Sequence, residues 1–424
     1  MKKVIMFIST IILTIIAVLA TILIVPAKIY ENTNVLKNII LLGAGALLII
    51  LFYLSIESKI FKVDLKDILI LLFLAFAVIS FYYSRNKDIS LWGEKNRYEG
   101  ILMIATYICI YIASKKFFKY KNFTTFLNIM FYVSLIIGIL GILQNYINYP
   151  KLTPIFGKGI AGTFTNSNFF GSYISIVLPV SITIFIFNQN KKCFILSIIM
   201  FFNLISSGTR SAWVAFIGVA LLGLVYLIKQ KNKIFWKNAG LLLIIFCIIT
   251  IYLFSGIGSR IAKSKANSIK KDMIILSKNG IEDSLGTDRI EIWKMTIKLL
   301  KMHPVFGVGP DNLRRSLAID CTDEFYAYGE AHNCVPDKAH NEYLQIAVTL
   351  GIPALVIYIS FISIILIPKL KNMNKEKKAL IYTLCISSYL IQAFFNISTI
   401  GVAPLFWMIL GFADNEEINN YKFD

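Results

Sequence analysis

The chain has 424 residues, of which 57% are hydrophobic and only 16% are charged, and its mean hydropathy is +0.69. Soluble globular domains carry about 25% charged residues, so this composition excludes an ordinary soluble fold. The formal net charge of +19 could indicate a nucleic-acid partner, but no nucleic-acid-binding motif accompanies it, and the lysines cluster between apolar segments as in membrane proteins.

The apolar segments predict an all-α membrane protein, because a helix needs about 20 apolar residues to cross the hydrocarbon core. We expect one polytopic membrane domain over residues 1–424, in which the first apolar run is an uncleaved span, since it is too long for a signal peptide. About twelve transmembrane helices are predicted, near residues 4–27, 38–56, 67–84, 100–118, 123–147, 170–188, 193–207, 211–228, 237–255, 343–367, 379–398 and 402–413.

Basic residues give the expected orientation. With the N-terminus inside, the inner loops hold about 21 Lys and Arg residues and the short outer loops about 9. Twelve spans return the C-terminus to the inside, so both termini are expected to be cytoplasmic. The charged segment 256–341 then forms one large extracytoplasmic loop subdomain at the outer face of the cytoplasmic membrane.

This long loop is predicted to contain short helices. Thr287 or Asp288 can cap a helix that His303-Pro304 would end. Its apolar residues recur at helical spacing: Ile290, Trp293, Ile297 and Leu300. Such an amphipathic helix could lie flat on the outer leaflet.

The six cysteines show no zinc-ligand spacing, and we expect neither a metal site nor a cofactor. Cys321 and Cys334 share the long loop, and they could form a disulfide if the compartment is oxidising.

Arg210 is the most informative polar residue on the predicted outer side, because it separates two spans with hardly any loop between them. Its guanidinium could extend to lipid headgroups, or it could bind a phosphate through two parallel hydrogen bonds. Arg289, at the start of the loop helix, could bind the second phosphate of a pyrophosphate, or pair with Asp288 or Glu291.

His340 directly precedes a span, beside Asn341, and is one of three histidines. Histidine can accept a proton at neutral pH, as a general base must, but it could equally be an interfacial polar residue.

The remaining substrate-binding candidates are Arg97, Asn166, Asn168, Trp213, Trp293 and Asn341. The two asparagines of the 162–171 segment could bind sugar hydroxyls or form a turn. The two tryptophans could stack on sugar or belong to the aromatic belt of the membrane interface.

Together these segments resemble the O-antigen ligase family, which also contains O-antigen polymerases and bacterial protein O-oligosaccharyltransferases. The resemblance is strongest in Gly208–Trp213, Arg289–Asn312 and Ala339–Gln345, and it extends over most of the chain. Ser167 departs from the family, which often has proline between the two asparagines.

The resemblance implies a membrane glycosyltransferase. Such enzymes take a glycan from an undecaprenyl-pyrophosphate carrier in the membrane and pass it to a saccharide or protein hydroxyl, with inversion and without metal. On that analogy Arg210 and Arg289 hold the pyrophosphate, and His340 activates the acceptor. Ligase, polymerase and protein glycosylation activities remain open.

The alternative function is a transporter or flippase for polysaccharide or lipid-linked oligosaccharide, although the spans lack the internal repeats that transporters often show.

Overall fold

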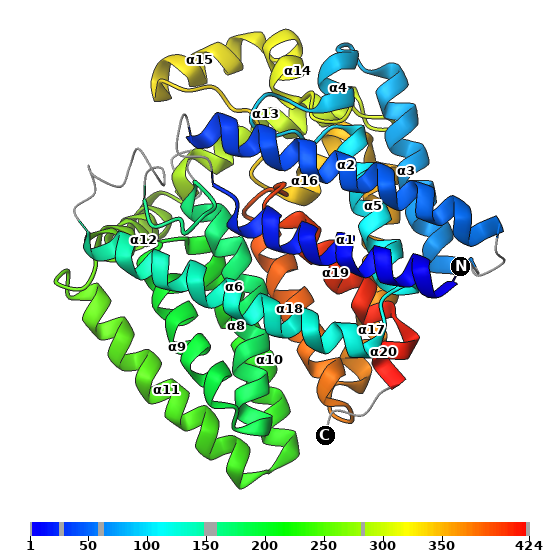
Figure 1. Ribbon diagram of the computed structural model, residues 1–424. Coiled ribbons are helices and arrows are strands. Elements are labelled where there is room, and N and C mark those ends of the chain that lie inside the picture. The colour runs from blue at the N-terminus through cyan, green and yellow to red at the C-terminus, as the bar shows by residue number, and fades with distance from the viewer. Residues whose placement is uncertain (1, 25–28, 58–62, 148–158, 281–284, 421–424) are drawn as a thin grey trace.

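A computed structural model describes residues 2–24, 29–57, 63–147, 159–280 and 285–420 of the protein (Figure 1). All regular secondary structure within these residues is helical, which confirms the predicted all-α class. The end of the first predicted span, 25–27, lies outside the described residues.

Helix is found in each of the twelve predicted segments. Eight of the described helices are long and apolar enough to cross a membrane: α1 (Lys2–Ile22), α2 (Ile29–Glu57), α3 (Leu65–Tyr83), α6 (Tyr120–Tyr146), α8 (Ser167–Asn188), α10 (Arg210–Gln230), α11 (Lys233–Phe254) and α17 (Ile352–Asn372). The other four segments hold shorter helices, of 12 to 17 residues: α5 (Ile101–Lys116), α9 (Lys191–Ser206), α18 (Lys377–Ala393) and α19 (Ala403–Asp414). The chain thus has several membrane-spanning helices, and the count of twelve stays a prediction.

Four helices of the described chain, of 8 to 20 residues, fill much of the predicted 256–341 loop. They are α12 (Arg260–Asn279), α13 (Leu285–Met302), α14 (Leu313–Asp320) and α15 (Thr322–His332). The last three share a small hydrophobic core with Val348 of α16 (Glu342–Leu350). Cys321 is buried in this core, Cys334 is exposed, and both are free thiols in the structure. Two further short helices, α4 (Lys87–Trp92) and α20 (Glu416–Asn420), complete the described chain.

The predicted span 343–367 is wrong as a single helix, because Gly351 divides it into α16 and α17. Gly351 has a φ of +98°, and a Cβ there would lie 1.9 Å from the carbonyl oxygen of Val305. The backbone N–H of Ile352 also donates to the carbonyl of Pro304 at 2.8 Å. The segment that follows α13 therefore packs directly on the helix break, which only glycine allows.

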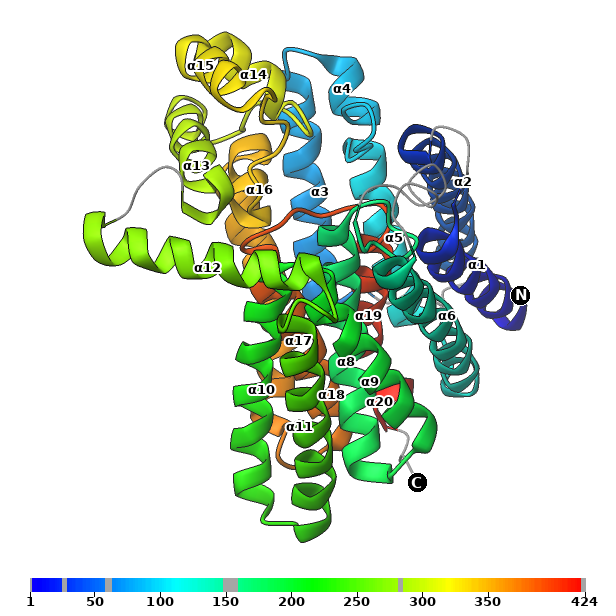
Figure 2. The ribbon, with the colours of Figure 1, turned by 90° about the vertical axis from the view of Figure 1, so that its left-hand side faces the viewer.

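The long helices differ in direction. Most of them run roughly parallel in Figure 2, whereas α1, α2 and α6 slant across the others in Figure 1. Helix α12 lies across the ends of α10 and α11 and contacts α9 and α11 (Figure 2). Helices α13 to α16 gather at the upper end of that view, beside α3 and α4.

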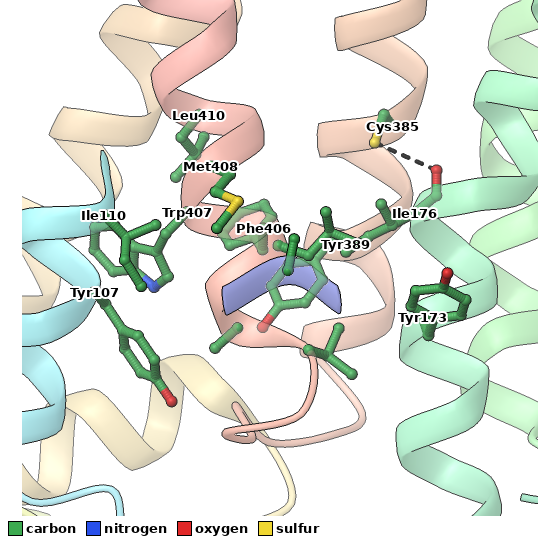
Figure 3. Close-up of a cluster of buried hydrophobic side chains, with 14 of the residues drawn as sticks. Tyr107, Ile110, Tyr173, Ile176, Cys385, Tyr389, Phe406, Trp407, Met408 and Leu410 are labelled. Atoms are coloured by element: carbon green, nitrogen blue, oxygen red, sulfur yellow. Dashed lines mark hydrogen bonds between the residues drawn. The ribbon is translucent and has the colours of Figure 1, made fainter. Parts of the chain in front are cut away.

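An aromatic core surrounds α19, which packs against α5 and α18, while α8 lies on the other side of α18 (Figure 3). The ring of Tyr389 in α18 stacks on Phe406 of α19, with 3.8 Å between the ring centroids. The Tyr389 hydroxyl also donates to the Glu342 carboxylate at 3.0 Å, and the Tyr358 hydroxyl donates to the same carboxylate at 2.9 Å. The core thereby fixes the first residue of α16, immediately after the His340-Asn341 pair.

Replacing Gly351 with alanine should lower the free energy of unfolding by more than about 2 kcal/mol, because the added Cβ meets both a left-handed backbone and the Val305 carbonyl. Thermal unfolding of the detergent-solubilised protein measures this loss. Gly223→Ala is the matched control, since nothing lies within 4 Å of a Cβ at that position. Equal melting temperatures for the two variants would contradict the packing described here.

Candidate functional site

The predicted site residues lie mainly at the beginnings of helices. Arg97 precedes α5, Asn166 caps α8, Arg210 is the first residue of α10, and His340 and Asn341 precede α16. Unpaired backbone N–H groups give a helix N-terminus a partial positive charge, which favours anions. These positions suit an anionic ligand, but their use as one site depends on whether the segments meet.

The segment before α8 and the turn before α10 are in direct contact. The Thr209 hydroxyl donates to the carbonyl of Ser167 at 2.8 Å. A Cβ at Gly171 would lie 2.5 Å from Cγ2 of Thr209, so the two helix starts approach as closely as glycine permits. Arg210, next to Thr209, is therefore held beside the N-terminus of α8.

Helix α12 covers the other side of this turn. Gly208 has a φ of +68°, and a Cβ there would lie 2.8 Å from Cγ of Lys265 in α12. The guanidinium of Arg210 donates from Nη1 to Oδ2 of Asp272, also in α12, at 2.5 Å. The side chains of Arg210 and Asp272 are 16% and 25% exposed, so solvent screens their ion pair only partly.

Trp293 of α13 brings Arg289 toward His340. Its indole N–H donates to the carbonyl of Ala339 at 2.9 Å, one residue before His340. Arg289 precedes Trp293 by four residues, so the two side chains share one face of α13. Arg289 is thus directed to the side of the helix that faces the His340 segment.

Arg289 is linked electrostatically to Arg210 on one side and to His340 on the other. Burial, together with the positive charge of Arg210, lowers the pKa of Arg289 to about 10, which still leaves the guanidinium protonated at neutral pH. Burial and the charge of Arg289 lower the pKa of His340 to about 4. Arg289 is thus the group that links the two others, since it is affected by Arg210 and itself affects His340, and the imidazole of His340 is neutral at pH 7.

His340 has two features that ordinary packing does not explain. Its φ is +50°, a left-handed conformation that is uncommon for a residue other than glycine. Its Nδ1 atom is buried and has no hydrogen-bond partner within the described part of the chain. Strained backbone and unsatisfied buried polar atoms occur preferentially at functional sites, which supports a role for this histidine.

Arg97 lies beside the same segment. Its Nε donates to Oδ2 of Asp337 at 2.6 Å, and its guanidinium lies 5.8 Å from the ring centre of Phe169 in α8. Burial by itself raises the pKa of Asp337, but the charge and hydrogen bond of Arg97 outweigh burial and keep that pKa below its usual value. The fold thus brings Arg97 to the His340 segment as an ion pair.

Sequence reasoning missed four residues that hold the site together, namely Asp272, Asp311, Asp337 and Lys338. Lys338 forms a buried ion pair with Asp311. The other carboxylate oxygen of Asp311 accepts from the backbone N–H of Glu94 at 2.7 Å and from that of Glu99 at 3.3 Å. Two signals were present in the sequence: Asp337-Lys338 stands directly before Ala339-His340, and Asp272 is the one acidic residue of α12.

Three predicted substrate-binding residues, Asn166, Asn341 and Trp213, make local structural contacts through their side chains. Oδ1 of Asn166 accepts from the backbone N–H of Asn168 at 2.8 Å, and Oδ1 of Asn341 accepts from that of Leu344 at 3.0 Å. Both asparagines are therefore helix caps. The indole N–H of Trp213 donates to the Leu204 carbonyl at 2.7 Å, within the same helix pair. These contacts favour the turn and packing interpretations for Asn166, Asn341 and Trp213, whereas for Asn168 they involve only the backbone, so a sugar-binding role of its side chain stays a prediction.

Comparison with known families supports the resemblance predicted from the sequence. Residues 195–359 match the family model described as O-antigen ligase. The matched range contains Arg210, Arg289 and His340, whereas Arg97 and the 162–171 segment lie before it. The resemblance to the O-antigen ligase and polymerase family is therefore confirmed over these residues. The chain has no significant match among curated proteins.

The lowered pKa of His340 predicts how stability depends on pH. In the unfolded chain histidine titrates near pH 6.5, whereas in the folded chain it stays neutral down to about pH 4. Protonation thus favours the unfolded state as the pH falls from 6.5 to 4, by up to about 3 kcal/mol, and has no effect above this range.

His340→Asn should remove this part of the pH dependence, and asparagine also tolerates the left-handed backbone. Melting temperatures of both proteins at pH 7 and pH 5 measure the difference. A wild-type chain whose stability falls no more than that of the variant would argue against a buried neutral imidazole.

Proposed function

We propose that this multi-pass membrane protein, whose residues 195–359 match the O-antigen ligase family, transfers or polymerises a glycan from an undecaprenyl-pyrophosphate carrier. The acceptor is a saccharide or protein hydroxyl, and the reaction takes place at the outer face of the cytoplasmic membrane. The family match supports a role in surface polysaccharide assembly. The finer proposal rests on two observations: the charge of Arg210 acts on Arg289, and α13, which carries Arg289, is hydrogen-bonded through Trp293 to the residue before His340.

Arg210 and Arg289 bind the donor pyrophosphate in this mechanism. A guanidinium offers parallel N–H donors that match two phosphate oxygens, and its charge stabilises the anion that leaves. The lowered pKa of Arg289 comes first from burial and then from the positive charge of Arg210, so the two arginines repel each other in the free protein. A bound pyrophosphate relieves this repulsion, because it places negative charge between them.

His340 acts as the general base. It is neutral at pH 7, so its free ring nitrogen can accept the proton of the acceptor hydroxyl. The acceptor oxygen then attacks the anomeric carbon from the side opposite the pyrophosphate, and the bond from that carbon to the pyrophosphate oxygen breaks. One displacement inverts the anomeric configuration, and the carrier leaves as undecaprenyl pyrophosphate.

The mechanism has no step that requires a metal ion. The two guanidinium groups supply the positive charge that the leaving pyrophosphate needs, and they are charged at every physiological pH. His340 accepts the proton of the acceptor hydroxyl. We therefore expect transfer to be insensitive to EDTA.

The deciding experiment is glycan transfer by purified protein from an undecaprenyl-pyrophosphate-linked oligosaccharide, with EDTA present. Arg210→Ala and His340→Ala should each reduce the rate more than about 100-fold, because each removes a group that acts in the transition state. The length of the product separates polymerase from ligase activity.

Arg85→Ala and His303→Ala are matched controls. Arg85 forms an exposed ion pair with Asp320 at 2.7 Å, and His303 contacts the same carboxylate at 3.2 Å, so both lie in polar contacts unrelated to His340. Both controls should keep the wild-type rate. Transfer that persists in the two site variants would refute the mechanism. Donor that crosses vesicle membranes without being transferred would favour the flippase alternative.

Trp293→Phe tests whether α13 positions His340. The change keeps the aromatic ring between α13 and the His340 segment but removes the N–H that binds the Ala339 carbonyl. We expect kcat to fall about tenfold with little change in the KM for the donor, because small displacements of a catalytic group are costly. Trp236→Phe, on the exposed side of α11, is the control. A change in donor KM alone would indicate that Trp293 binds substrate.

A further inference from the structure

The charge distribution of α12 is unusual for a helix that covers a basic site. Six of its residues are basic, namely Arg260, Lys263, Lys265, Lys270, Lys271 and Lys278. Asp272 is its one acidic residue, and this carboxylate is the group that binds Arg210. An otherwise basic helix thus presents its single negative charge to the arginine that the proposed function assigns to phosphate binding.

The contact is built into the packing of α12. Ile261 and Lys265 of this helix touch the position of Gly208, two residues before Arg210. Asp272 follows Lys265 by seven residues, which is close to two full helical turns, so both project toward the Arg210 turn. The Asp272 contact is therefore part of the face by which α12 covers the turn.

Asp272 offsets part of the positive charge that the arginines near the site carry. Arg97 is paired with Asp337, and Arg210 is paired with Asp272. Arg289 has no acidic partner in the described part of the chain, and its pKa is lowered by burial and by the charge of Arg210. The carboxylate of Asp272 thus places a negative charge beside Arg210, which lowers the electrostatic cost of having the guanidinium groups of Arg210 and Arg289 near each other.

A carboxylate and a phosphate offer a guanidinium the same arrangement of two acceptor oxygens. We propose that Asp272 is a positioning residue that occupies Arg210 in the donor-free chain and is exchanged for a phosphate of the donor pyrophosphate. This inference rests on the proposed function, since it takes Arg210 as a phosphate ligand. The exchange keeps Arg210 oriented before the donor arrives, and part of the donor's binding energy is used to displace the carboxylate.

The exchange predicts that removal of the Asp272 charge increases the affinity for the donor. Asp272→Asn should bind donor more tightly than wild type, because the phosphate no longer competes with a carboxylate for Arg210. An ion pair of this exposure corresponds to about a fivefold change in Kd. A residue that merely supported the site would give weaker binding when changed.

The experiment measures the Kd of undecaprenyl pyrophosphate for the purified full-length protein in detergent micelles. Wild type, Asp272→Asn, Asp272→Glu and Arg210→Ala are compared. Asp272→Glu keeps the negative charge and should bind like wild type. Asp320→Asn is the matched control, because Asp320 also pairs with an arginine, Arg85, but lies outside the site, and its Kd should not change.

Each outcome has a distinct meaning. Tighter binding by Asp272→Asn, with loss of binding in Arg210→Ala, supports the exchange. Unchanged or weaker binding by Asp272→Asn overturns it while leaving the donor site intact. An Asp272→Asn chain that fails to fold also overturns it, because the exchange requires a stable fold when the pair is broken. Wild-type binding by Arg210→Ala would instead refute the proposed function itself.

Discussion

The buried ion pair between Lys338 and Asp311 joins the segments that surround the candidate site. Asp311 also accepts two backbone N–H groups from the loop that carries Arg97, while Lys338 stands two residues before His340. Separating two buried opposite charges costs several kcal/mol, because each would be left uncompensated in a poorly polarisable interior. The ion pair therefore fixes the position of the Arg97 loop relative to the His340 segment. The positions of Asp337, Trp293 and the start of α16 depend on this arrangement.

Burial lowers the pKa of both kinds of basic group at this site but leaves them in different charge states, and the combination is useful chemically. It disfavours the charged form of every group, so His340 becomes neutral, whereas arginine stays protonated because its intrinsic pKa is so high. A neutral proton acceptor can thus lie close to two permanent cations. A lysine in place of either arginine would be far more sensitive to burial, and its point charge would not match the two oxygens of a phosphate. The arrangement suits an anion that leaves while a hydroxyl loses its proton.

Much of the fold follows from the sequence pattern, and the errors have identifiable causes. Apolar length predicts where helices occur, because unpaired backbone groups cannot be left in a hydrocarbon environment. The break at Gly351 was missed because α16 and α17 are both apolar, although Gly351-Ile352-Pro353 is a recognisable interruption. The α13 helix was predicted, but the centre of its buried face is Ile292, Met295 and Leu299; of the residues expected there, Leu300 packs against this core, whereas Ile297 is exposed. That helix packs against α14 and α16, and a pattern within one segment does not contain this information.

By itself the sequence determined the all-helical membrane class, the separation of polar segments from apolar ones, and the three basic residues on which the proposed function rests. These properties are local, because hydrophobic length and residue type are properties of short stretches. Only the tertiary structure decided which carboxylate faces which arginine, as with Asp272 and Arg210, since that pair joins residues 62 positions apart. The same holds for the neutral state of His340, which depends on burial and on a charge from α13. Pairing and burial are set by packing between segments that are distant in the sequence, so a local sequence pattern cannot predict them.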